Sequence, residues 1–286
     1  MTSGRRGAPG REEGGDAAGR DRPVRDAPAR GAVRLIVLGD LTDFLPPPGR
    51  GTASAATTRP IDGRPAVKDV VEAAGIPHPE VGALLVNGGP VGLGARLSDG
   101  DEVEVLPWAD AARRGLPPAA PPSPEDAEAP RFAVDGHLGR LGAYLRMLGF
   151  DTWYRPRADD DELAAVAAAE GRVVLTRDRG LLKRSAVRRG AFVRADRPFE
   201  QLVETARRFG LLSRATPFGR CIRCNGRLDA VPREEVLDRL LPLTRRYYRE
   251  FRRCADCGAV YWRGSHHARM ARLIERVRAA AASGAG

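Results

Sequence analysis

One pattern recurs three times in this sequence, in FAVD at residues 132–135, VVLTRD at 173–178 and FVRAD at 192–196. Each is a short apolar run that leads into an aspartate, and such runs are typical of short strands. Helical patterns separate them, so we expect four βα units and a parallel sheet with right-handed crossovers. In an open α/β sheet, ligands bind beyond the carboxyl ends of the strands. Asp135, Asp178 and Asp196 should therefore meet at one sheet edge.

The segments between these strands fit the same α/β class. Leucines at 138, 141, 145 and 148 recur at helical spacing, and Gly149 is placed to end that helix. The sequence further predicts a strand at 151–154, a helix from Asp160 or Asp161 to Glu170, a short helix around Leu181 and Leu182, and a helix from Pro198 to Phe209.

A fourth group of acids, DDDE at residues 159–162, opens the helix between the first two aspartate-ended strands. Four carboxylates at one edge would repel one another unless a divalent cation joined them. Mg²⁺ and Mn²⁺ prefer carboxylate and water oxygens. Taken singly, Asp160 or Asp161 could be a helix N-cap, Asp196 another cap, and Asp178 part of a turn. Their common placement favours a Mg²⁺ or Mn²⁺ site, with the choice between Asp160 and Asp161 open.

Such a site would serve phosphodiester chemistry. The ions would polarise the phosphate, lower the pKa of a bound water and stabilise the departing oxygen. Asp135, Asp178 and Asp196 would be ligands or would support ligands, and the Asp160/Asp161 pair would add another. Arg140, Arg177 and Lys183 could hold substrate phosphates, although each could equally be a surface or packing residue.

The distribution of charge supports a nucleic-acid partner. The net charge is +10, and residues 131–286 hold 32 Lys and Arg against 18 Asp and Glu, while residues 1–130 hold 15 against 19. A basic surface around an acidic pocket suits a nuclease, because arginines bind phosphates while carboxylates bind metal. The alternative is a general bias toward arginine, since only Lys68 and Lys183 are lysines.

Composition divides the chain into six parts. We expect a disordered tail at 1–30, a small β-grasp domain at 31–107, an extended Pro-rich linker at 108–130, the α/β domain at 131–212, a cysteine-containing module at 213–278 and a frayed tail at 279–286. No apolar run approaches the roughly 20 residues that span a bilayer, and the first residues lack the apolar core of a secretory signal. These features favour a cytoplasmic protein with no membrane partner.

The four cysteines form two CxxC pairs, Cys221 with Cys224 and Cys254 with Cys257. Two such pairs complete a tetrahedral zinc site, and an inserted apolar helix around residues 236–243 explains the long gap between them. A disulfide or redox pair is the alternative, disfavoured by the cytosolic setting and by the duplication. His266 and His267 could replace a ligand, but four thiols already suffice. Zinc here would be structural, since no ligand position stays open.

Several motifs, in order, resemble the Mut-seven carboxyl-terminal RNase domain family, a branch of the PIN-like nucleases. They are DGHLGRL at 135–141, YLRMLGFD at 144–151, LTRD at 175–178, and, for the attached zinc ribbon, CIRCN at 221–225, CADC at 254–257, VYW at 260–262 and GSH at 264–266. The resemblance covers about residues 131–270. It implies a divalent-metal ribonuclease site carried by Asp135, Asp160, Asp178 and Asp196, beside a zinc ribbon that assists RNA binding.

The amino-terminal part resembles the ubiquitin-like β-grasp domain often joined to this family. The likeness rests on DFLP at 43–46, VKDVVE at 67–72, GIPHPEV at 75–81 and NG at 87–88. Sulfur carriers of this fold need a free Gly-Gly end, whereas this domain ends at LPW (106–108) and continues, so we expect protein or RNA docking instead. The leading hypothesis is a metal-dependent ribonuclease; the alternatives are a non-catalytic RNA-binding adaptor and, less favoured, a phosphatase-type hydrolase.

Overall fold

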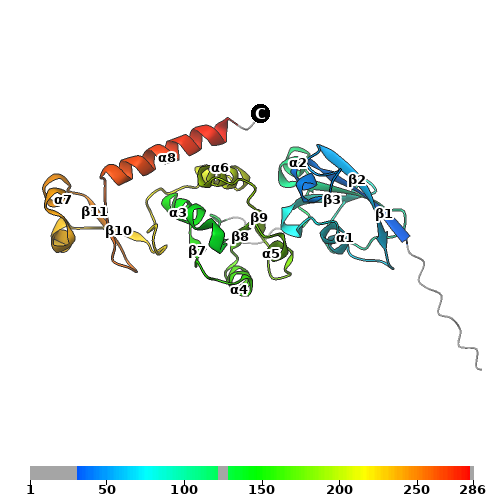
Figure 1. Ribbon diagram of the computed structural model, residues 1–286, viewed down its shortest axis with the longest axis horizontal. Coiled ribbons are helices and arrows are strands. Elements are labelled where there is room, and N and C mark those ends of the chain that lie inside the picture. The colour runs from blue at the N-terminus through cyan, green and yellow to red at the C-terminus, as the bar shows by residue number, and fades with distance from the viewer. Residues whose placement is uncertain (1–30, 122–127, 284–286) are drawn as a thin grey trace, which may run out of the picture.

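The computed structural model describes residues 31–121 and 128–283, and these form three separate β-sheets. Figure 1 shows the sheets in succession along the longest axis, the first in blue and cyan, the second in green and the third in yellow and orange. The tail expected at 1–30 lies outside the described residues. The three sheets agree with the predicted combination of β-grasp, parallel α/β and zinc-ribbon folds.

The first sheet has five strands in the order β2-β1-β5-β3-β4. Its elements are β1 (Gly31–Leu38), β2 (Ser54–Ile61), α1 (Val67–Ala73), β3 (Val81–Val86), β4 (Gly89–Val91) and β5 (Glu102–Pro107). The two central strands, β1 and β5, are parallel, whereas all other pairs are antiparallel. This mixed sheet with one helix is the β-grasp arrangement.

Alternating burial holds this domain together. In β1, Val33, Leu35 and Val37 are buried while Arg34 between them is exposed, as expected for a sheet with one face toward a core. Helix α1 contributes buried valines such as Val71 to the same core. Burying each such side chain stabilises the domain by about 1.5–3 kcal/mol.

The segment after β5 differs from the extended linker expected from residue 108. Helix α2 (Trp108–Arg113) packs against β3 and β5, and its Ala111 is buried. The chain then stays on the β-grasp domain as far as Ala119, which is buried and donates its backbone N–H to Gly82. The segment therefore packs on the β-grasp domain through Ala111 and Ala119, although its Pro-rich composition predicted an extended chain.

The second sheet is fully parallel, in the order β7-β6-β8-β9. Its strands are β6 (Phe132–Val134), β7 (Thr152–Tyr154), β8 (Val173–Thr176) and β9 (Gly190–Phe192), and its helices are α3 (Gly139–Met147), α4 (Asp160–Glu170), α5 (Arg179–Lys183) and α6 (Pro198–Arg208). The sequence predicted each of these elements to within a few residues at either end. We refer to this unit as the α/β domain.

Helices cover both faces of the parallel sheet. Phe132 and Leu175 face the core beneath α3 and α6, whereas Ala133 and Val174, one residue along each strand, face α4 and α5. The strands therefore read as continuous apolar runs, because both of their faces are buried. Since the helices occupy the faces, polar chemistry is left to the edge where the strands end.

The third sheet, β10-β11-β12, is antiparallel and belongs to the zinc ribbon. It comprises β10 (Leu228–Val231), β11 (Phe251–Cys254) and β12 (Val260–Trp262). The expected apolar insertion between the CxxC pairs forms a 3₁₀ helix, η6 (Arg233–Arg239), followed by α7 (Pro242–Tyr247). The sequence therefore located this insertion, although it forms two short helices rather than one.

The last helix, α8 (Ser265–Ala282), leaves the ribbon and returns along α6, as Figure 1 shows in red. Ile274 and Val277 are buried in the core of the α/β domain. The helix therefore extends to Ala282, beyond the point at 279 where fraying was expected. Among the described residues, no helix is long and apolar enough to span a bilayer.

Candidate functional site

Thr176 connects two of the predicted acids at the carboxyl edge of the parallel sheet. Asp135 follows β6, and Asp178 comes two residues after the end of the adjacent β8. The hydroxyl of the fully buried Thr176 donates a hydrogen bond of 2.6 Å to Oδ2 of Asp135. The same hydroxyl oxygen accepts from the backbone N–H of Asp178 at 2.9 Å. Thr176 was not among the site residues predicted from the sequence, where its only signal was a hydroxyl at the end of an apolar strand.

Both aspartates also stabilise the turns that follow them. Asp135 Oδ1 accepts from the backbone N–H of His137 at 3.3 Å, and Asp178 Oδ1 accepts from that of Gly180 at 2.6 Å, at the start of α5. Capping of the following helix thus occurs at both positions, whereas the sequence had suggested a local role, in a turn, for Asp178 alone. It does not exclude a metal role, because a carboxylate has about four lone-pair sites and capping occupies only part of them.

In the acidic run, Asp159 is the cap of α4, rather than Asp160 or Asp161 as the sequence suggested. Its Oδ1 accepts from the backbone N–H of Glu162 at 2.8 Å. The pKa of Asp160 is raised by partial burial and by the nearby charges of Asp178 and Asp135, against the opposing effect of Arg184. Asp160 therefore lies in the electrostatic field of the other two acids.

Asp161 and Asp196 are both exposed, and each is paired with an arginine. The Asp161 side chain is 86% exposed and pairs with Arg184. The Asp196 side chain is 85% exposed, and its Oδ1 lies 2.7 Å from Nη1 of Arg177. Arg197, not Asp196, is the N-cap residue of α6, and it makes no side-chain capping bond. Strand β9 (Gly190–Phe192) ends four residues before Asp196, rather than directly before it as expected, and the Asp196 carboxylate is engaged by an arginine.

The acids are not gathered as tightly as the cysteines. Across residues 31–121 and 128–283, only the four Sγ atoms form a group of metal-binding donors within 4.8 Å of one another. Asp135, Asp160 and Asp178 nevertheless offer only carboxylate oxygens, the ligand type that suits Mg²⁺ and Mn²⁺. Burial is the largest cause of the raised pKa of Asp160, and repulsion by Asp178 and Asp135 adds to it; a bound cation would relieve that repulsion.

The three predicted phosphate-binding residues have different surroundings. Arg140 is exposed on α3. Arg177 donates to the carbonyl of Ala195 at 2.9 Å and pairs with Asp196. Lys183 lies against the β-grasp domain, where Nζ donates to the carbonyl of Glu72 at 2.6 Å. Of the three, Arg140 and Arg177 are exposed, whereas Lys183 is half-buried.

The four cysteines meet in the zinc ribbon as predicted. Sγ of Cys221 lies 3.7 Å from that of Cys257, and Sγ of Cys224 lies 3.3 Å from that of Cys254. This cluster has the composition of a tetrahedral structural zinc site. Burial raises the pKa of the Cys221 thiol, but hydrogen bonds from Tyr261 and from backbone N–H groups outweigh it and lower the pKa to about 7. His267 instead stacks on Phe218, with ring centroids 4.1 Å apart.

The first cysteine turn is fixed to the α/β domain. Asn225, in the left-handed conformation (φ 77°), accepts from the backbone N–H of Thr152 in β7 and donates to Asp151, both at 2.9 Å. The buried Arg146 of α3 donates to the carbonyls of Thr152 and Arg223. The ribbon is therefore an integral part of the fold around β7.

Two family profiles match the chain. The Mut7-C RNAse domain matches residues 130–274, and the Mut7-C ubiquitin domain matches residues 31–113. No curated protein and no solved structure matches the sequence. The matched ranges coincide with the parallel sheet plus ribbon and with the β-grasp sheet. The chain belongs to the Mut7-C RNAse domain family and carries a Mut7-C ubiquitin domain ahead of the RNAse domain.

Proposed function

We propose that this protein is a divalent-metal-dependent ribonuclease that hydrolyses RNA phosphodiesters at the carboxyl edge of the parallel sheet. The observation that carries the proposal is the junction of Asp135, Thr176 and Asp178, with Asp160 in the same electrostatic field. Membership of the family supports nuclease chemistry in general, and the acids supply a place for it.

Asp135, Asp160 and Asp178 are the residues that we assign to Mg²⁺ or Mn²⁺, with Asp196 joining from the turn between β9 and α6. When bound, such an ion polarises the phosphate and acidifies a water molecule. Thr176 fixes the carboxylate of Asp135, while the N-terminal turn of α5 fixes that of Asp178. The side chains thus enter the reaction already oriented, which reduces the reorganisation that the transition state requires.

The RNA partner is supported by charge. Arg140 is exposed on the helix that follows Asp135, and Arg177 lies beside Asp196. In the ribbon, Tyr247 is exposed, with the guanidinium of Arg246 5.5 Å from its ring centroid. Aromatic rings among arginines suit unpaired bases and phosphates. We assign the ribbon to RNA binding, its cysteines to one structural zinc ion, and the protein to a reducing, cytoplasmic setting.

A non-catalytic RNA-binding adaptor is the second candidate. Two observations favour it: the Asp196 carboxylate is paired with Arg177, and Lys183 is directed at the β-grasp domain. In that case the acids bind metal weakly and the β-grasp domain recruits a protein partner. The two candidates differ in whether the protein cuts RNA.

The test uses purified full-length protein, 5′-labelled single-stranded RNA, and buffers with Mn²⁺, with Mg²⁺ or with EDTA. Asp135→Asn and Asp178→Asn, purified in parallel, guard against contaminating nucleases, and Asp161→Asn is the matched control on the exposed neighbour. We expect Mn²⁺-dependent cleavage that both variants lose and the control keeps. Binding without cleavage at any metal concentration supports the adaptor, and equal cleavage by Asp135→Asn contradicts the proposed site.

A further inference from the structure

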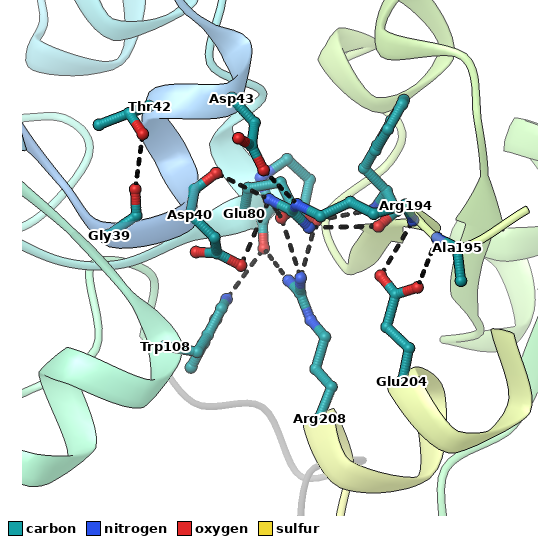
Figure 2. Close-up of polar contacts among 12 residues, drawn as sticks. Gly39, Asp40, Thr42, Asp43, Glu80, Trp108, Arg194, Ala195, Glu204 and Arg208 are labelled. Atoms are coloured by element: carbon teal, nitrogen blue, oxygen red, sulfur yellow. Dashed lines mark hydrogen bonds and ion pairs between the residues drawn. The ribbon is translucent and has the colours of Figure 1, made fainter. Parts of the chain in front are cut away.

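Where the β-grasp domain contacts the α/β domain, the carboxylate of Glu80 is buried, and its side chain is only 1% exposed. Glu80 lies in the 3₁₀ helix η2 (His78–Glu80), just before β3. Figure 2 shows Arg194 and Arg208 reaching Glu80 from the α/β domain. A buried charge is costly unless it is paired and hydrogen-bonded, so the burial of the Glu80 carboxylate depends on the groups that contact it.

The partners of Glu80 come from two different elements. Oε1 accepts from the backbone N–H of Phe192 in β9 at 2.7 Å, so the carboxylate occupies part of the open edge of the sheet. Both carboxylate oxygens lie 2.9 Å from Nη1 of Arg208, at the end of α6. Arg194, two residues beyond β9, reaches Oε2 at 3.2 Å. Glu80 therefore connects β9 to α6.

The turn that carries Asp196 lies between these same two elements. In α6, Glu204 accepts from the backbone N–H groups of Arg194 and Ala195 at 3.0 and 2.9 Å. Gln201 donates to the carbonyls of Ala195 and Asp196 at 3.1 and 3.2 Å. The position of Asp196 in this turn is thus set by how α6 sits against the residues that follow β9.

The arginine that precedes this turn is held on its other side by the β-grasp domain. Nε of Arg194 lies 3.3 Å from Oδ2 of Asp43, and Nη2 lies 3.4 Å from Oδ2 of Asp40. Its guanidinium also covers the ring of Phe44 at 5.1 Å. Arg179, directly after Asp178, donates to the carbonyls of Asp43 and Phe44, both at 3.2 Å. The β-grasp domain therefore contacts residues next to two of the assigned acids.

We propose that Glu80 of the β-grasp domain is a positioning residue for the nuclease site, acting through Arg194, Arg208 and β9 on the turn that carries Asp196. This inference rests on the proposed function. The β-grasp domain, in addition to any docking role, is then a part of the catalytic unit, and it orients an acid that it does not touch.

The experiment compares full-length wild type with Glu80→Gln, which keeps an oxygen for the Phe192 N–H and removes the charge. Val103→Ala, a fully buried position in β5, lowers the stability of the same domain without touching the interface. Glu102→Gln, whose salt bridge to Arg34 is exposed, controls for loss of an acid. Two readouts are taken: Mn²⁺ affinity, by direct titration and as half-activation of RNA cleavage, and hydrogen exchange of amides 192–196.

For Glu80→Gln we expect Mn²⁺ affinity to fall about tenfold, as for residues that orient a metal ligand, with a cleavage rate at saturating Mn²⁺ close to wild type. Exchange at residues 192–196 should accelerate, while that in β6 stays unchanged. Both control variants should leave both readouts unchanged. If Glu80→Gln behaves as Val103→Ala does, the positioning role is refuted. If wild-type protein neither binds Mn²⁺ nor cuts RNA, the proposed function fails, and the exchange of residues 192–196 alone decides the positioning role.

Discussion

The side chain of Thr176 donates a 2.6 Å hydrogen bond to Oδ2 of Asp135, from one parallel strand to the end of its neighbour. The bond joins residues 41 positions apart, and the donor is fully buried. Its oxygen also accepts from the Asp178 backbone, so two residues of the proposed site depend on one hydroxyl.

Replacement of that hydroxyl by a methyl group is therefore expected to impair both stability and cleavage. Thr176→Val keeps the shape of the side chain but leaves a buried N–H and a carboxylate oxygen without their partner, at a cost of about 1–3 kcal/mol in the free energy of unfolding. We expect cleavage to fall about 10- to 100-fold, as when the partner of a metal ligand is lost. Urea unfolding and RNA cleavage measure the two effects. Thr176→Ser should retain most of both, and equal behaviour of the two variants would argue against the hydroxyl.

Arg184 is expected to oppose metal binding. It pairs with Asp161, and its Nη2 lies 3.8 Å from Oδ2 of Asp160, so its charge lowers the negative potential of the acids. In Arg184→Ala, Mn²⁺ affinity should rise by up to about fivefold, which corresponds to the ~1 kcal/mol of an exposed ion pair. Calorimetric titration with Mn²⁺ measures the change. Arg188→Ala, an exposed neighbour, should bind Mn²⁺ as wild type does, and weaker binding by Arg184→Ala would show that the arginine supports the site.

Asp151 should make the stability of the protein depend on acid pH. Burial raises the pKa of its carboxyl, but hydrogen bonds from Arg172 and Asn225 exceed that effect and hold the pKa below the ordinary value of 3.8. A carboxyl with a lowered folded-state pKa stabilises the protein above the unfolded-state pKa, and this contribution disappears as pH falls through the folded-state value.

Asp151→Asn is therefore expected to lower the free energy of unfolding by about 2 kcal/mol at pH 7, since hydrogen bonds to a charged group are lost. The difference from wild type should narrow as pH falls below 3.8, because the carboxyl of the unfolded chain gains its proton there, while that of the folded protein does so only at lower pH. Thermal unfolding between pH 3 and pH 7 measures both, with the exposed Asp229→Asn as control. A deficit that is constant across this range would mean that packing, rather than charge, accounts for the effect.

Arg140 and Lys183 were both predicted to bind phosphates, and their surroundings now separate them. Arg140→Ala should weaken binding of single-stranded RNA and reduce the slope of log affinity against log salt by about 0.7, one phosphate contact. Lys183→Ala should instead cost about 1 kcal/mol of stability, because its Nζ donates to the carbonyl of Glu72 across the domain interface. Fluorescence anisotropy at several salt concentrations measures RNA binding by both variants, and urea unfolding measures their stability. A reduced slope for Lys183→Ala would show instead that Lys183 binds phosphate.

Much of the fold was readable from short-range pattern. The apolar runs before Asp135 and Asp178 became β6 and β8, because continuous apolar strands fit only between two helical layers. The CxxC pairs lie together because each forms a tight turn and both turns adjoin the same small sheet, so that their four thiols converge. The segment after Pro107 was misjudged, because composition does not show that Ala111 and Ala119 find apolar surface to cover.

The amino-acid sequence by itself determined the β-grasp, parallel α/β and ribbon folds and the cysteine cluster, since these follow from periodicity and spacing along neighbouring residues. Only the tertiary structure decided which acids share a field: Asp160 lies near Asp135 and Asp178, whereas Asp196 pairs with Arg177. It also decided that Glu80 is buried against Arg194, 114 positions away. The reason is physical: charges and hydrogen bonds act through space, and the distances that set their strength exist only once the chain has folded.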